Sequence, residues 1–176
     1  MVVFNNVDDI NKILRKYLIS QSELNSKHVF NSLSTYGKTL TKIFNNIATS
    51  YDRDETILLF ELSLNENNSN VSFTSNDSII YNQSYNLKIT LYGNESLNLS
   101  NKIIARLRTE KIRNSIYDEG IYLEKIENPK SLNEFINDVL WLRTDFNILL
   151  SCEFLYSQVE QDNNMENTSS IKLIDV

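Results

Sequence analysis

The longest regular alternation of apolar and polar side chains runs from Arg143 to Tyr156. Successive side chains of an extended strand point to opposite faces, so residues two apart share a face. One face of this segment is apolar and consists of Phe146, Ile148, Leu150, Cys152, Phe154 and Tyr156. The pattern predicts a strand with one buried face that extends over about 40 Å, well beyond the usual strand length.

The beginning of the chain has the spacing of amphipathic helices. Asn6 is suited to cap a first helix, and Asp8 and Asp9 fall in its first turn, where the helix dipole favours acidic side chains. A second helix is predicted from its cap, Asn25, to Gly37, a residue at which helices commonly end. The apolar positions are Val7, Ile10, Leu14, Tyr17 and Leu18 in the first helix and Val29, Phe30 and Leu33 in the second.

A second block of alternation begins near Glu55. Leu58 to Leu64 and Tyr85 to Leu91 each alternate as strands do, and we expect the two to pair antiparallel. The polar run Asn65 to Asp77 between them is rich in turn-forming residues and predicts a long hairpin loop. The stretch Lys38 to Ala48, before this block, fits either a helix or a short strand, and we expect a strand or an irregular arm.

A long helix is predicted from Glu95 or Ser96 to Gly120, because glycine readily adopts the left-handed conformation with which helices commonly end. The spacing of its apolar residues slips by one after Leu107, so the helix either kinks or restarts near Thr109.

Two further segments follow this helix. Ile121 to Ile126 alternates as a strand and is stopped by Asn128-Pro129. Lys130 to Leu142 is expected to be a crossing segment that leads into the long strand.

Together these elements predict an α+β fold: a mostly antiparallel four-stranded sheet with a long helix packed on one face and additional N-terminal helices. We divide the chain into N-terminal helices and an arm (1–50), an α+β core (51–160) and a flexible C-terminal tail (161–176). The last residues, IKLIDV, are apolar but too few to fold alone, and we expect them to dock on a neighbour as an added strand.

The composition of the chain excludes several classes of function. The chain has 176 residues, which suits one domain, and a net charge of −6, which leaves no general basic surface for duplex DNA. Its single Cys and single His exclude an internal disulfide and a Cys/His metal cluster. The N-terminal residues lack the regions of a signal peptide, and no apolar run approaches the about 20 residues of a membrane helix. We expect a protein made in a cytoplasm, without a membrane partner.

Candidate chemical groups favour structural roles. Asp52, Asp54 and Glu55 cluster beside Arg53, but no further ligand stands at metal-binding spacing, so a solvated loop is the simpler interpretation. Cys152 lies among apolar residues and is interpreted as a packed thiol. The sequence has no phosphate-binding glycine loop and no serine elbow. We therefore predict no catalytic, metal-binding or cofactor-binding residue, no cofactor and no enzyme activity.

One cluster of basic residues stands out in the sequence: Lys102, Arg106, Arg108, Lys111 and Arg113. A solvated helix face is the simpler interpretation, and the alternative is a charged surface that meets acidic residues of another subunit. RNA binding is poorly supported, because aromatic residues are not interleaved with these cations.

The second half of the chain resembles a known family. A strand ending in YG (NLKITLYGNES) leads into ARLRTEKIRNSIYDEGIYLEKI, then into NEFINDVLWLR and a long strand that begins LRTDF, with Arg143 and Asp145 near its start. This order is similar to that of bacteriophage neck or tail terminator proteins, and more broadly of tail-completion and head–tail joining proteins. The resemblance covers about residues 55 to 158; the tail after Val159 has no counterpart that we place.

The resemblance implies a structural virion protein of the neck or tail, assembled in the host bacterial cytoplasm. Such proteins form rings, usually of six subunits, that terminate the tail tube or connect it to the portal and adaptor and let the genome pass without specific binding. We take as candidate subunit-interface residues Lys102, Arg106, Arg113, Phe154 and Tyr156. Candidate ring-to-ring contacts lie in loops and arms at Asn67, Asn70, Phe73 and Phe44.

A second function remains open from the sequence. A cytoplasmic adaptor or regulatory module would bind a protein partner along an exposed edge of the sheet. It would share the fold and the lack of catalytic groups with a virion protein. The two differ in where the protein is found.

Overall fold

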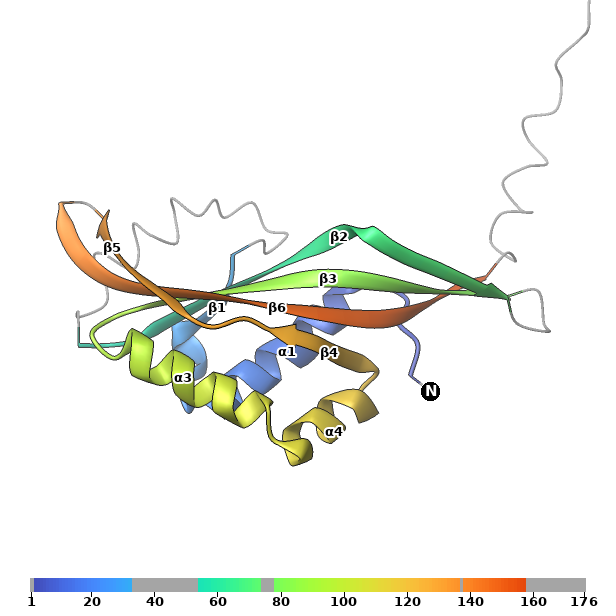
Figure 1. The fold of residues 1–176 in the computed structure, drawn as a ribbon, viewed down its shortest axis with the longest axis horizontal. Helices are drawn as coiled ribbons and strands as arrows, with labels where there is room; N and C mark the ends of the chain where they lie inside the picture. Colours follow the sequence, from blue (N-terminus) through green and yellow to red (C-terminus); the bar gives the residue numbers. More distant parts are fainter. Residues whose placement is uncertain (1, 33–53, 74–77, 137, 158–176) are drawn as a thin grey trace, which may run out of the picture.

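The computed structural model of the chain describes residues 2–32, 54–73, 78–136 and 138–157. The expected arm Lys38–Ala48, which contains Phe44, and the tail 161–176 lie outside these residues. Figure 1 shows the elements. In chain order they are α1 (Val7–Ser22), the 3₁₀ turn η1 (Ser26–His28), β1 (Val29–Asn31), β2 (Ile57–Phe73), β3 (Ser78–Tyr92), α3 (Ser96–Leu107), α4 (Glu110–Asp118), β4 (Ile121–Ile126), β5 (Lys130–Ile136) and β6 (Val139–Ser157).

The described strands form one mixed six-stranded sheet in the order β1-β2-β3-β6-β4, with β5 also paired to β6. β1 runs parallel to β2, and the other pairs are antiparallel. The three long strands β2, β3 and β6 run side by side along the length of the molecule (Figure 1). The predicted α+β class is confirmed. The prediction of a four-stranded sheet with one long helix is wrong in detail, because the described sheet has six strands and the long helix is divided into α3 and α4.

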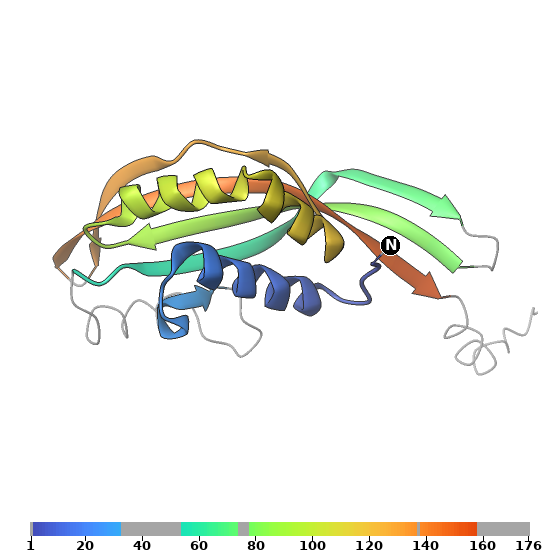
Figure 2. The ribbon, with the colours of Figure 1, turned by 90° about the horizontal axis from the view of Figure 1, so that it is seen from below.

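The helices α1, α3 and α4 all lie on one face of this sheet (Figure 2). Between them and the sheet lies the main hydrophobic core, and β6 supplies the apolar face that its alternation predicted. Phe146, Ile148, Leu150, Cys152 and Phe154 are each at most 3% exposed. No helix in the described part of the chain combines the length and the apolar character needed to cross a membrane.

The helix ends follow local sequence signals. The Asn6 side chain accepts a hydrogen bond from the Asp9 backbone N–H at 3.0 Å, which confirms it as the cap of α1. The predicted long helix does restart near Thr109, since α3 ends at Leu107 and Thr109 is extended at the start of α4. Gly120 follows Glu119, the C-cap of α4, with φ +85°, and a Cβ there would lie 2.9 Å from Val2 Cβ.

The second predicted helix is wrong. Val29 and Phe30 belong to β1, which pairs with Leu58–Phe60 of β2. The turn η1 before it is capped by Asn25, whose side chain accepts from the Lys27 backbone N–H. The third apolar residue of the predicted helix, Leu33, lies outside the described residues.

Lys130–Leu142 is a hairpin rather than a crossing segment. β5 pairs with the start of β6 in a register that joins Ile136 to Val139 and Lys130 to Asp145. Asp138, between the two strands, has φ +62°, a left-handed conformation that Asp tolerates in turns.

The polar run Asn65–Asp77 is mostly strand, so the prediction of a long loop is wrong. β2 continues to Phe73 and β3 begins at Ser78, with a register shift between Leu64 and Ser69. Because a backbone ladder does not require apolar side chains, the polar composition of this run did not reveal the strands.

A smaller apolar cluster lies on the sheet face opposite the helices, near the β5–β6 hairpin. It contains Ile57, Leu59, Tyr92, Ile136 and Trp141, with Phe30 and Val139 packed against it. The start of β2 is thus buried on both faces.

Candidate functional site: surfaces for assembly

Two of the predicted interface cations contact their own chain. Glu23, the left-handed cap of α1 at φ +61°, accepts from Lys102 Nζ at 2.5 Å and from the Arg106 guanidinium. Arg106 also donates to the Gln21 carbonyl at 2.8 Å. The hydrogen bonds from Lys102 and Arg106 lower the pKa of Glu23 to about 2. These contacts tie the end of α1 to α3.

The third predicted cation, Arg113, reaches the sheet from α4. Its Nη2 donates to the Leu123 carbonyl of β4 at 3.0 Å. Arg108 at the end of α3 donates similarly to the Ile126 carbonyl at 3.4 Å. The structure therefore does not bring Lys102, Arg106 and Arg113 together as one free surface, although a role in subunit contacts stays a prediction.

The predicted interface at the far end of β6 starts from a buried side chain. Phe154 is 3% exposed and stacks on Tyr81, with ring centroids 5.5 Å apart and planes at 16°. Phe4 and Tyr85 complete the cluster around it. Tyr156 pairs with Ile79 through the backbone. In the single chain Phe154 is thus a packing residue, whereas Leu155 beside it is 41% exposed.

The predicted ring-to-ring residues Asn67, Asn70 and Phe73 lie in β2 rather than in a loop. Together with the paired parts of β3 and β6 they form what we call the distal arm: Ser69–Phe73, Ser78–Gln83 and Cys152–Ser157. Figure 2 shows that the arm extends past the helices at one end of the molecule. The fourth residue, Phe44, lies outside the described residues.

At the other end of the molecule, the β5–β6 hairpin exposes an apolar surface that the sequence analysis missed. Phe135 is 73% exposed, and Leu140 and Leu142 are each 42% exposed. The register pairs Phe135 with Leu140 and Asn133 with Leu142, so the three apolar side chains share one face. We call them the hairpin patch. The alternation Leu140-Trp141-Leu142, apolar on both faces, was the available signal.

The opposite face of the same hairpin carries an ion-pair network. Arg143 makes a bidentate pair with Asp145 at 2.8 and 2.6 Å and donates to Glu134 at 2.8 Å. The Tyr92 hydroxyl donates to the same Glu134 oxygen at 2.7 Å. The hydrogen bond with Asp145 is the main cause of the raised pKa of Arg143, and burial is the main cause of the raised pKa of Tyr92. The network joins β3, β5 and β6.

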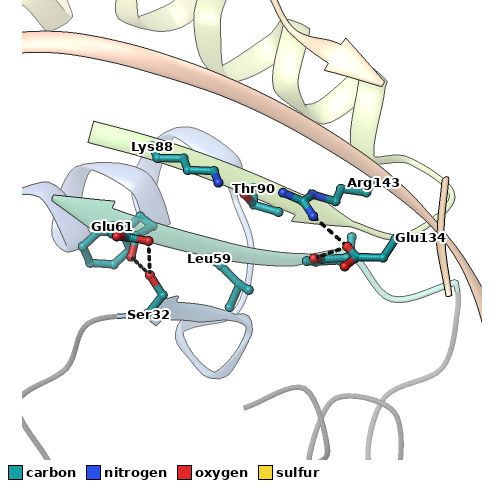
Figure 3. A pocket seen from close by; sticks show the side chains of 9 residues that line it. Ser32, Leu59, Glu61, Lys88, Thr90, Glu134 and Arg143 are labelled. Atoms are coloured by element: carbon teal, nitrogen blue, oxygen red, sulfur yellow. Dashed lines mark hydrogen bonds and ion pairs between the residues drawn. The ribbon is translucent and has the colours of Figure 1, made fainter. Parts of the chain in front are cut away.

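A pocket of about 240 Å³ opens beside this network (Figure 3). Its charged lining residues are Glu61, Lys88, Glu134 and Arg143, together with the hydroxyls of Ser32 and Thr90. Because Arg143 already donates to two carboxylates, it is not available to bind an anion without breaking these pairs. The arrangement supports strand pairing rather than ligand capture.

The described residues contain no group of three or more His, Cys, Asp or Glu that could hold a metal ion. Cys152 is fully buried, and burial raises the pKa of its thiol to about 12. The interpretation of Cys152 as a packed thiol is confirmed.

Comparison with known proteins gives one family. A family model described as phage neck terminator protein matches residues 8–175, which is nearly the whole chain. The match includes the N-terminal helix and the C-terminal tail, whereas the resemblance noted from the sequence covered only about residues 55 to 158. No curated protein matches the sequence.

Proposed function

The chain belongs to the phage neck terminator protein family and is a structural protein of the neck and tail junction, and from this premise we propose that copies of it close into a six-membered ring. The ring terminates the tail tube or joins it to the portal and adaptor proteins. It assembles in the host cytoplasm before it is incorporated into the virion.

The observation that supports the proposed ring is that two distinct surfaces lie at opposite ends of one chain. The hairpin patch lies at one end and the distal arm at the other (Figures 1 and 2). Contacts between unlike surfaces are heterologous, and they produce rings when the rotation between subunits closes. Exposed apolar side chains that gather on one face are typical of protein contact sites.

The net charge of the chain suits passage of the genome. Each subunit has a net charge of −6, so a ring of such subunits repels the phosphates of DNA. It offers no general basic surface from which DNA binding could release counterions. DNA is therefore expected to slide through the ring without specific binding. Asn67, Asn70 and Phe73, together with Phe44, remain the candidates for contacts with the rings above and below.

The ring is tested by converting the hairpin patch to a charged surface. The double variant Phe135→Asp/Leu140→Asp is expected to sediment as a monomer under conditions in which the unaltered chain forms a ring. Both side chains are exposed in the single chain, so the variant should keep its circular dichroism spectrum. The matched control is Val7→Asp, which changes another exposed apolar residue, in the first turn of α1.

Sedimentation of the double variant tests whether the hairpin patch is a subunit contact. A ring that forms equally well from the double variant would exclude the hairpin patch as a subunit contact. Absence of any ring from the unaltered chain, together with absence from the neck in electron micrographs of virions, would exclude the proposed ring.

The adaptor function is the second candidate, because the outer side of β2 is an open sheet edge over much of its length in the described chain. Family membership places the chain among virion structural proteins, and edge pairing then serves assembly within the particle. Detection of the protein in purified virions separates the two functions.

A further inference from the structure

The two edges of the sheet are closed to different degrees. On one side β6 is covered along its length: by β5 at Val139–Asp145, by β4 at Ile148–Cys152, and by Phe4 at the arm. Phe4 exchanges backbone hydrogen bonds with Glu153 and Leu155 at 2.8 and 3.2 Å. Beyond β4, Arg108 and Arg113 donate to two of its carbonyls. This side is protected against the addition of another strand.

The β2 side is open. β1 pairs only with Leu58–Phe60, and no described strand lies on the outer side of β2 from Leu62 to Phe73. The register shift divides this stretch, because Leu64 pairs with Tyr85 and Ser69 already pairs with Gln83. Bulges interrupt strand addition. The regular part of the open edge is therefore Ser69–Phe73, in the distal arm.

The chain itself contains a segment of matching size and composition. After the end of β6 at Ser157, the sequence is polar as far as Ser170 and then ends in IKLIDV, Ile171–Val176. Ile and Val favour strands, and a six-residue segment is sufficient to pair with the regular part of the edge.

The end of β6 also lies close to this edge. Ile79 pairs with Phe73 on one side and with Tyr156 on the other, so β6 leaves the sheet two strands from β2. A position outside β2 is thus three strand spacings away, about 14 Å at roughly 4.8 Å each. The residues between Ser157 and Ile171 span up to about 43 Å when extended. The segment can reach an arm other than its own if the two subunits are adjacent.

We propose that Ile171–Val176 of one copy adds as a strand to Ser69–Phe73 of the neighbouring copy. This inference rests on the proposed ring, in which it requires that the distal arms of neighbouring subunits lie within the about 43 Å span of the tether. Each donated strand would cover one open edge, so a closed ring leaves no edge of this kind unpaired.

Hydrogen exchange read by mass spectrometry tests the proposal in the full-length chain. The double variant Leu173→Pro/Ile174→Pro removes two adjacent N–H groups, one of which must face the edge. Amides of Ser69–Phe73 are expected to exchange about tenfold faster in this variant, because the added strand no longer protects them. Thr168→Pro/Ser169→Pro, in the polar tether, is the matched control and should leave exchange unchanged.

A mixing experiment identifies the donor. The ¹⁵N-labelled Leu173→Pro/Ile174→Pro variant is combined with the unlabelled, unaltered chain, and exchange is followed in the labelled copy. Recovered protection of its Ser69–Phe73 amides shows that a neighbour supplies the strand. Unrecovered protection, when the unaltered chain alone is protected, shows pairing within one copy and overturns the proposal.

The remaining outcomes separate this inference from the ring. Equal exchange in the two double variants overturns strand addition, and sedimentation of a ring in the same samples leaves the proposed function standing. Protection transferred from a neighbour in a species that is not a ring supports strand addition and contradicts the ring.

Discussion

Arg143 shows how single residues fix the hairpin end of the molecule. Its side chain is 19% exposed, and its guanidinium is shared between Asp145 on its own strand and Glu134 on β5. A lysine has one ammonium group in place of this planar fork and could not make both contacts with the same geometry. Trp141, on the same face of β6, is 2% exposed, and its indole N–H has no hydrogen-bond partner among the described residues. Packing, not hydrogen bonding, therefore holds Trp141.

Leu150 provides a test of the buried face of β6. It is fully buried under the helices, so Leu150→Ala should leave a cavity and lower the free energy of unfolding by about 2–5 kcal/mol. Leu155→Ala makes the same change on the same strand at a side chain that is 41% exposed, and it should cost much less. Chemical denaturation of the two variants measures the difference. Equal midpoints would show that Leu150 does not lie in the core.

At the scale of elements, one carboxylate at the end of α1 binds two cations of α3. The pKa of Glu23 is about 2 in the folded chain, below its ordinary value of 4.5. A carboxyl group with a lowered pKa stabilises the fold above its unfolded pKa, and this contribution is lost as the pH falls through the folded value. The contribution of Glu23 should therefore be complete at pH 7 and fade between about pH 4.5 and pH 2.

Glu23→Gln isolates this contribution. Since the side chain is exposed, solvent weakens the pairs, and the variant should melt only slightly below the unaltered chain at pH 7. The gap between the two melting temperatures should narrow as the pH falls toward 2. Glu124→Gln, at an exposed position of β4 without an ion pair to the described residues, is the control. A gap that does not change with pH would show that Glu23 acts through the backbone of the α1 cap alone.

The elements that were predicted correctly are those with strong local signals. α1 has a capping Asn and two acidic residues in its first turn, and the slip in apolar spacing after Leu107 located the break between α3 and α4. β6 was evident because its alternation is long. In each case neighbouring residues determine the structure.

The missed elements depend on partners far away in the sequence. β1 has three residues and exists because Leu58–Phe60 of β2 lies beside it. β5 was hidden because its apolar residues fit a crossing segment as well as a hairpin, and the turn at Asp138 lacks the glycine that usually marks one. The ion pairs of Glu23 with Lys102 and Arg106 join residues about 80 positions apart, as their separations of 79 and 83 show. No local pattern reveals such contacts.

At the scale of the whole molecule, the helices and the assembly surfaces occupy different regions. α1, α3 and α4 cover the middle of one sheet face, while the hairpin patch and the distal arm lie at the two ends (Figure 2). In the single chain the predicted interface cations contact the end of α1 and β4. Assembly through the two ends would therefore leave the helical face and its ion pairs intact.

This separation predicts which amides become protected when subunits associate. Hydrogen exchange of the unaltered chain, measured at concentrations below and above ring formation, should slow at residues 130–142 and in the distal arm, because a neighbour excludes water from both ends. Exchange in the second half of α1, which contacts α3 through Gln21 and Glu23, should not depend on concentration. The monomeric Phe135→Asp/Leu140→Asp variant is the control, since its exchange should match the dilute chain at every concentration. Protection confined to α1 and α3 would place the subunit contact on the helical face and restore Lys102 and Arg106 as its leading residues.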